Sequence, residues 1–87
     1  MSDRDPDYRA FIEKQPCLVS GASPSIAHHQ PRRGHGAVGM KCSDYRCIPL
    51  AHVYHDEFHR TSWPFYAKYG IDVEAEIARL NALYFFA

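Results

Sequence analysis

SIAHHQPRRGHGAVGMKCSDYRCIPLAHVYHDEFHR, residues 25–60, contains all six histidines of this 87-residue chain. Residues 25–30 are suited to a short strand, and the glycine-rich residues 31–39 are suited to an extended loop. Residues 45–48 form a second β-prone run, which Pro49 is expected to end. Residues 50–60 follow a helical pattern without glycine or proline. The segment therefore predicts a strand, a long loop, a second strand and a helix, in that order.

A helix is predicted before this segment. Asp5 followed by Pro6 is typical of a helix start, because the aspartate can cap the first turn and the proline has no N–H to satisfy there. Apolar residues at helical spacing predict a helix over residues 6–15, and Pro16 ends it.

Two helices are predicted after the segment. A short helix over residues 65–69 is expected to end at Gly70. Asp72 can cap a longer helix over residues 72–85, where acidic residues in the first turn suit the helix dipole. The apolar stripe of this helix consists of Val73, Ile77, Leu80 and Tyr84.

Composition narrows the class of protein. The chain is short enough for one domain, so we expect a single α+β domain over residues 1–87 with its core at about residues 25–60. Ten basic and ten acidic residues give a net charge of +0, which argues against an arm that coats nucleic acid by charge alone. The sequence contains no apolar run long enough to predict a membrane span, and its acidic N-terminus does not resemble a signal peptide. Three cysteines, an odd number, favour a reduced, cytoplasmic setting.

The histidine spacing is typical of a metal site. His55 and His59 are four residues apart, so they share one face of the predicted helix. His28 and His29 are neighbours on a predicted strand and point to opposite sides. One of them can join the helical pair around a cation, leaving open coordination positions as a catalytic metal requires. The other is then a candidate general base.

Two further histidines have weaker claims to this site. His52 lies on the same helical face and is either a fourth ligand or a solvated residue, and we favour the solvated position. His35 lies in the glycine-rich loop, where exposure to solvent is favoured over contact with a phosphate.

Taken together, these motifs resemble the HNH endonucleases, the ββα-metal or His-Me finger class. Within that class they most resemble the phage recombination-enhancement nucleases and their bacterial relatives. The resemblance covers residues 8–82. The motifs that carry it are His28-His29-Gln30-Pro31, Lys41-Cys42-Ser43-Asp44, Ile48-Pro49-Leu50 and His55-Asp56-Glu57-Phe58-His59.

The resemblance implies a small ββα-metal core with flanking N- and C-terminal helices, and a role for each site residue. His28, His55 and His59 would bind one divalent metal ion, Mg²⁺ or Zn²⁺, with Mn²⁺ and Ni²⁺ as further candidates. His29 would be the general base that activates a water molecule. Asp44 would brace the loop and orient that base. The implied reaction is hydrolysis of a phosphodiester bond by a DNA endonuclease or nickase.

The implied substrate and partners follow from the same resemblance. The phosphates of DNA would be held by Arg32, Arg33, Lys41 and Arg46. A recombinase filament or another protein would help to bring the DNA, since the net charge of the chain is zero. The implied setting is the cytoplasm of a bacterium or of a phage-infected host cell.

The chain departs from the class at a structural zinc site. Relatives hold this zinc with a C-x-x-C pair and with a cysteine and a histidine at the helix start. The corresponding residues here are Cys17, Ser20, Ala51 and Tyr54, so we expect the structural zinc to be absent. A less favoured alternative is a replacement set of Cys17, Cys42, Cys47 and His52.

Without that zinc, Cys17 is expected to be a small buried apolar residue. The core would then rely on aromatic side chains. These are Tyr8, Phe11, Phe58, Trp63, Phe65, Tyr66, Tyr69 and Tyr84.

Two questions stay open from the sequence. The apolar end over residues 83–86 either packs on the first helix or forms a homodimer contact. The second question is catalysis: the alternative to a nuclease is a non-catalytic, metal-stabilised adaptor of the same fold that binds nucleic acid or protein. The presence of both His28 and His29 favours the nuclease, because a purely structural metal site needs no general base.

Overall fold

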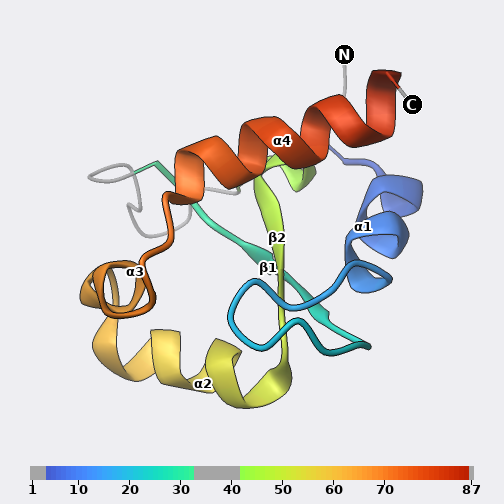
Figure 1. The fold of residues 1–87 in the computed structure, drawn as a ribbon. Coiled ribbons are helices and arrows are strands. Elements are labelled where there is room, and N and C mark those ends of the chain that lie inside the picture. Colours follow the sequence, from blue (N-terminus) through green and yellow to red (C-terminus); the bar gives the residue numbers. More distant parts are fainter. Residues whose placement is uncertain (1–3, 33–41, 87) are drawn as a thin grey trace.

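The computed structural model describes residues 4–32 and 42–86. Four α-helices and a two-stranded sheet make up the described part of the chain, which confirms the predicted α+β class (Figure 1). The elements in chain order are α1 (Pro6–Glu13), β1 (Ile26–His29), a 3-10 turn η1 (Asp44–Arg46), β2 (Cys47–Leu50), α2 (His52–Thr61), α3 (Pro64–Tyr69) and α4 (Val73–Phe86).

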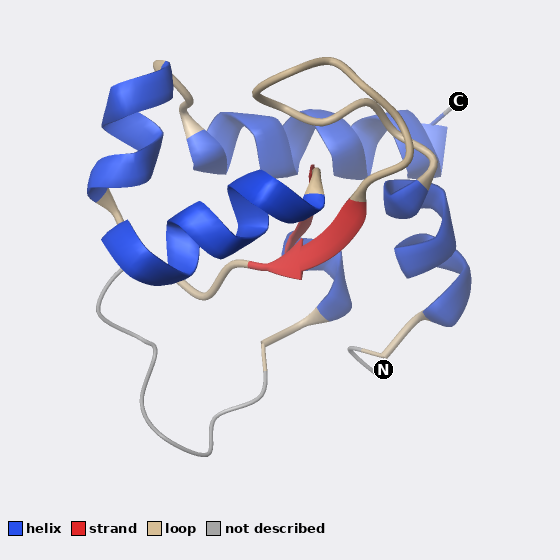
Figure 2. Ribbon diagram, turned by 90° about the horizontal axis from the view of Figure 1, so that it is seen from below, coloured by secondary structure: helices blue, strands red, loops and turns tan. Residues whose placement is uncertain are grey.

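The two strands lie at the centre of the molecule, and the helices surround them. In the view of Figure 1, α4 lies above the strands next to η1, α2 lies below them and α1 lies to their right, and Figure 2 shows the same arrangement from below. Helices α1 and α2 each contact both strands, whereas α4 contacts β2 and η1. The strands pair in the antiparallel direction, with Ile26 opposite Leu50 and His28 opposite Ile48. This pairing fixes which side of the sheet each of the neighbouring histidines faces.

The second strand differs from the prediction. It starts later than expected, because Asp44–Arg46 wind into a turn in which the Ser43 hydroxyl accepts the N–H of Tyr45 at 3.1 Å. It also continues through Pro49, which was expected to end it. Proline is tolerated here because a two-stranded sheet has only edge strands. The Pro49 carbonyl instead accepts the N–H of Leu18 at 3.0 Å.

The helix boundaries follow their predicted signals closely. Asp5 caps α1 by accepting the N–H of Tyr8 at 3.0 Å, and α1 ends at Glu13, slightly before the predicted boundary. Gly70 closes α3 in the left-handed conformation, with φ of 67°. Asp72 then caps α4 by accepting the N–H of Ala75 at 3.1 Å. Among the described residues, no helix is both long and apolar enough to cross a membrane.

The buried apolar core comes from α1, Cys17, β2, α3 and α4, whereas α2 and β1 contribute apolar side chains that are only partly buried. As predicted, Cys17 is buried. Of the eight aromatic residues expected in the core, Tyr8, Phe65 and Tyr66 are buried. The other five pack against the core while partly exposed, and they are Phe11, Phe58, Trp63, Tyr69 and Tyr84.

The apolar end of α4 packs on α1, which was one of the two alternatives left open. The Tyr84 ring lies edge-on to Tyr8, with ring centroids 4.9 Å apart, and also contacts Phe11. Phe85 stacks on Tyr8, although about half of its surface remains exposed. Phe86 is 85% exposed.

Candidate functional site

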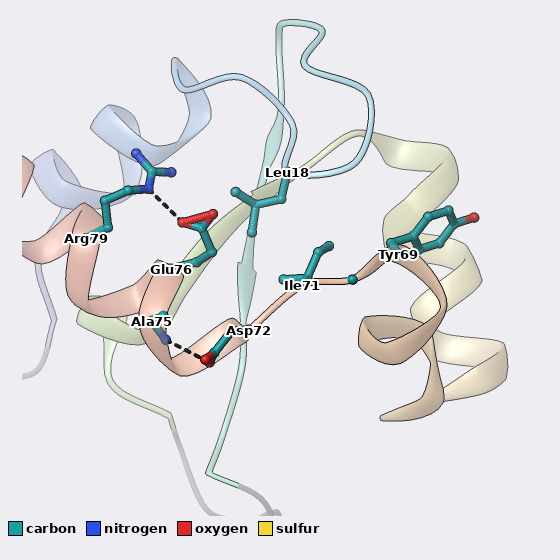
Figure 3. A pocket seen from close by; sticks show the side chains of 8 residues that line it. Leu18, Tyr69, Ile71, Asp72, Ala75, Glu76 and Arg79 are labelled. Carbon is teal, nitrogen blue, oxygen red and sulfur yellow. Dashed lines mark hydrogen bonds and ion pairs between the residues drawn. The ribbon is translucent and has the colours of Figure 1, made fainter.

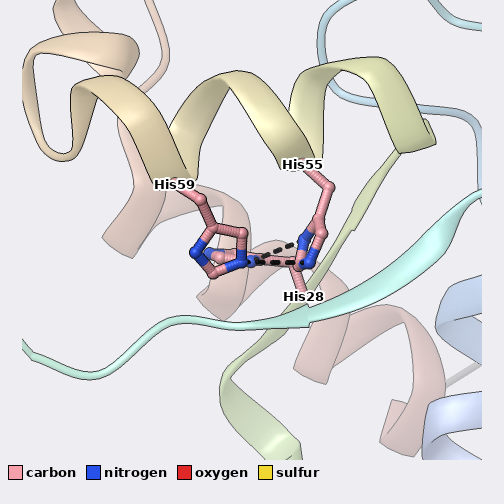
Figure 4. A group of neighbouring side chains, drawn as sticks. All are labelled: His28, His55 and His59. Atoms are coloured by element: carbon pink, nitrogen blue, oxygen red, sulfur yellow. Dashed lines mark hydrogen bonds between the residues drawn. The ribbon is translucent and has the colours of Figure 1, made fainter.

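Three histidines meet between β1 and α2 (Figure 4). His28 projects from the strand, and His55 and His59 project from successive turns of the helix. The Nδ1 atoms of His28 and His55 are 3.0 Å apart, and the Nε2 atoms of His55 and His59 are 3.1 Å apart. His28 is 3% exposed, whereas His59 lies at the surface, so the group is closed on the strand side and open on the helix side.

Burial keeps the inner histidine uncharged. It is the largest influence on His28 and lowers its pKa to about 4, while the hydrogen bond to Gln30 acts in the opposite direction. Burial and the neighbouring His59 also lower the pKa of His55. At neutral pH both rings therefore have a nitrogen lone pair for a cation, which protonated rings would lack.

The geometry and chemistry of this donor set fit a divalent metal. One ligand nitrogen from each ring can be chosen so that all three lie within 4.8 Å of one another. Two imidazole nitrogens on one tetrahedral zinc, each about 2.0–2.1 Å from the metal, lie roughly 3.3 Å apart. Three neutral nitrogens suit Zn²⁺ or Ni²⁺ better than Mg²⁺, which prefers oxygen ligands.

His29 faces away from this group and pairs with Asp44. Its Nε2 lies 2.7 Å from Asp44 Oδ1. A carboxylate only accepts hydrogen bonds, so Nε2 carries a proton, and in the neutral ring the lone pair is on Nδ1. The His29 side chain is 35% exposed, whereas that of Asp44 is fully enclosed. The pair is therefore a solvent-accessible imidazole oriented by a buried acid.

The N-terminal segment holds Asp44 in its charged form. Arg4 and Arg9 form ion pairs with Asp44 at 3.1 and 3.2 Å, and the Asp5 N–H donates to it at 2.7 Å. Burial alone would raise the pKa of Asp44, but the hydrogen bonds from His29 and Asp5 and the charge of Arg9 bring it below its ordinary value. Asp44 is therefore a charged partner for His29 at neutral pH.

His29, Asp44 and Cys47 also lie close enough together to be tested as a second metal site. Burial raises the pKa of the Cys47 thiol to about 12, so at neutral pH the thiol is protonated and a poor ligand. Both oxygens of Asp44 already accept hydrogen bonds from other groups. This group is better described as an acid–base pair beside a buried thiol.

His52 and the described basic residues lie outside the three-histidine group. His52 is exposed and 3.5 Å from Asp56, outside the three-histidine group. Arg32 is exposed. Arg46, predicted to bind DNA, donates to Glu74 and to the Gln30 carbonyl. The predicted DNA contacts Arg33 and Lys41, and His35, for which exposure to solvent was favoured, lie outside the described part of the chain.

The less favoured zinc set of Cys17, Cys42, Cys47 and His52 does not come together in the described part of the chain. Cys17 and Cys47 are buried, whereas the His52 side chain is largely exposed. The four side chains are therefore not placed to share one ion.

Comparison with known proteins places the chain in a family. Residues 2–84 match the family described as "Protein of unknown function (DUF968)". The chain belongs to the DUF968 family. It is also similar to "Uncharacterized protein YdfU" of Escherichia coli (strain K12), with 33% identity over 67 residues. The match covers 77% of this chain but only 19% of that relative, so the chain spans about a fifth of the relative's length. No solved structure matches the chain.

Sequence reasoning missed several residues around the site of this DUF968 chain. Gln30 contacts His28 directly, and Tyr66 contacts Gln30. Arg4 and Arg9 contact Asp44. Gln30 lies within a quoted motif, so its position next to the histidine pair was an available signal. The other three come from distant segments, and no local pattern marks them.

A separate hollow of about 420 Å³ lies where α3 joins α4 (Figure 3). Leu18, Tyr69 and Ile71 provide apolar walls. Its charged residues interact with neighbours in the same helix, since Arg79 pairs with Glu76 at 2.6 Å. None of its lining residues belongs to the histidine group or to the His29–Asp44 pair.

Proposed function

We propose that this DUF968 chain is a metal-dependent nuclease domain that hydrolyses phosphodiester bonds in DNA, as an endonuclease or nickase. One observation carries the proposal. Adjacent residues of β1 supply a ligand of the three-histidine group and the imidazole of an acid–base pair. The resemblance of the motifs to HNH endonucleases supports the same reading.

Each group has a defined part in the proposed reaction. A divalent ion bound by His28, His55 and His59 would supply positive charge to the scissile phosphate and to the leaving oxygen. His29 accepts the proton of a water molecule at Nδ1, the nitrogen that does not face Asp44. The charged Asp44 then stabilises the imidazolium that forms, and it keeps the ring in one orientation throughout.

The donor set guides the choice of cation. Zn²⁺ and Ni²⁺ have the highest expected affinity for three imidazoles, with Mn²⁺ weaker and Mg²⁺ weakest. Activity need not follow affinity, because the ion must also exchange a phosphate oxygen and a water ligand. All four ions therefore belong in the test.

The proposed DNA contacts involve only a few basic residues. Arg32 is exposed beside the end of β1, and Arg33 and Lys41 remain proposed contacts outside the described residues. Arg46 has an internal ion pair, so it would have to exchange Glu74 for a phosphate. A protein partner such as a recombinase filament, or a second copy of the chain, would add affinity. We place this activity in the cytoplasm of a bacterial or phage-infected cell.

A second candidate is a non-catalytic adaptor that keeps the metal and binds nucleic acid or protein. The net charge of +0 favours it, because nucleases that act alone on DNA gain affinity from a basic surface. The presence of an oriented acid–base pair favours catalysis instead, since binding alone requires no general base.

Plasmid nicking with each of Mg²⁺, Mn²⁺, Zn²⁺ and Ni²⁺ tests the proposal. We expect His29→Ala to lower the cleavage rate by about 10²–10⁴-fold while leaving metal binding intact. His52→Ala is the matched control, because it removes an exposed histidine of α2 outside the group. A folded wild-type protein that cleaves with none of the metals would refute the nuclease and leave the adaptor.

A further inference from the structure

The side chain of Gln30 lies immediately behind His28, on the side away from the helix histidines. Gln30 is 2% exposed, and its Oε1 is 3.0 Å from His28 Nε2. The Tyr66 hydroxyl from α3 donates to the same Oε1. Both contacts are buried, so water cannot replace either partner without cost.

The hydrogen bonds around Gln30 determine which way its amide points. The Nε2 amide group donates to the Pro31 carbonyl at 3.1 Å, and a carbonyl can only accept. The amide oxygen must therefore face His28 and Tyr66. Burial raises the pKa of the Tyr66 hydroxyl, which keeps it protonated and able to donate.

This orientation fixes the proton of His28. Because Gln30 Oε1 is an acceptor, His28 Nε2 must carry the hydrogen that lies between them. The Nδ1 atom of the neutral ring then has the lone pair, and it points toward His55 Nδ1, 3.0 Å away. The ring thus presents an unprotonated nitrogen to the three-histidine group.

Gln30 itself is held by contacts that connect it to α4. The Arg46 Nε donates to the Gln30 carbonyl at 2.8 Å, and the Gln30 N–H donates to the Arg46 carbonyl at 3.2 Å. The Arg46 guanidinium makes a two-pronged ion pair with Glu74 of α4. The orientation of His28 therefore depends on helices outside the strand–strand–helix core.

We propose that Gln30 and Tyr66 are positioning residues that hold His28 as the Nε2–H tautomer with Nδ1 directed at the metal. This inference rests on the metal site of the proposed function and adds the residues that prepare it. Metal-binding histidines commonly donate their second ring N–H to a fixed acceptor, and loss of that acceptor typically weakens metal affinity by about 10–100-fold.

Titration with Co²⁺, followed by its visible absorption, measures the metal affinity of the whole chain without relying on cleavage. We expect Gln30→Met, which keeps length but removes the acceptor, to raise the Kd about 10–100-fold. Gln30→Glu restores an acceptor and should recover most of that loss. Tyr66→Phe should raise the Kd by a smaller factor.

Tyr69→Phe is the matched control for Tyr66→Phe. It removes a hydroxyl from the same helix, one that donates to Glu57 rather than to Gln30. Its Kd should equal that of the wild type. Equal Kd values for the wild type, Gln30→Met and Tyr66→Phe would overturn the inference.

Long-range proton–nitrogen NMR spectra of the metal-free protein provide a second readout. The wild type should show His28 as the Nε2–H tautomer, and Gln30→Met should show a mixture of both tautomers. A wild-type His28 protonated on Nδ1 would overturn the inference. If the wild type binds no Co²⁺ but shows the Nε2–H tautomer that Gln30→Met loses, the metal site of the proposed function fails while the positioning role stands.

Discussion

Asp44 illustrates how a single residue links stability to pH in this protein. Its enclosed carboxylate accepts hydrogen bonds or ion pairs from His29, Arg4, Arg9 and the Asp5 N–H. These partners favour the charged form and hold the folded-state pKa below the ordinary value of 3.8. Protonation therefore removes interactions that only the folded state makes.

The expected consequence is an acid-dependent loss of stability that Asp44→Asn lacks. A depressed folded-state pKa gives stabilisation that is present above the unfolded-state value and is lost as the pH falls through the folded-state value. Urea unfolding at pH 7, 5, 4 and 3 should therefore show a steeper decline for the wild type than for Asp44→Asn. Asp56→Asn, at an exposed position of α2, is the matched control. Parallel curves for the wild type and Asp44→Asn would contradict this account.

At the residue scale, sequence patterns placed the histidines but not the groups that orient them. Alternation along a strand and the four-residue helical spacing correctly predicted that one histidine of the pair would meet His55 and His59. The partners of His28 could not be read in this way. Tyr66 reaches the site from α3, 36 residues beyond Gln30, and only the folded chain brings the two together.

At the scale of elements, the junction between α3 and α4 depends on one backbone conformation. Gly70 has φ of 67°, and the Ile71 N–H that follows donates back to the Tyr66 carbonyl at 2.9 Å. A Cβ added at Gly70 would meet nothing within 4 Å. The cost of a side chain there is therefore conformational rather than steric.

Gly70→Ala should lower the free energy of unfolding by about 1 kcal/mol, because left-handed backbone disfavours residues with a Cβ. For a domain of this size the loss corresponds to a decrease in Tm of about 4–8 °C. Gly70→Asn should cost less, since asparagine tolerates this conformation better. Thermal unfolding of the wild type, Gly70→Asn and Gly70→Ala measures their order of stability. An alanine variant as stable as the wild type would rule out the conformational argument.

The boundaries of helices and strands were predictable where a local sequence signal sets them. Boundaries set by tertiary contacts were not predictable from the sequence. Caps at Asp5 and Asp72 and the stop at Gly70 are local, and all three are present in the structure. The prediction that Pro49 would end the second strand was wrong. Its position was expected to interrupt hydrogen bonding, but a two-stranded sheet leaves one edge of each strand without a neighbouring strand.

At the scale of the whole molecule, a chain of 87 residues has a small core and gains much from any ligand that binds only the folded state. The three-histidine group joins β1 to α2, and contacts through Gln30 and Arg46 extend to α3 and α4. A bound cation would therefore tie together elements from both halves of the sequence. The sequence predicted that these three histidines would come together, but not that the residues supporting them come from most of the fold.

This arrangement predicts that a bound metal stabilises the entire domain. At a free metal concentration of about 100 times Kd, mass action adds about 2.7 kcal/mol to the free energy of unfolding, or roughly 10–20 °C in Tm. His59→Ala should lose most of this increase, because it removes a proposed ligand that lies at the surface and contributes little to the core. His52→Ala should keep all of it, since its side chain lies outside the group. Thermal unfolding with Zn²⁺, and again after addition of a chelator, measures the effect. An equal increase in the wild type and in His59→Ala would mean that the ion binds elsewhere on the chain.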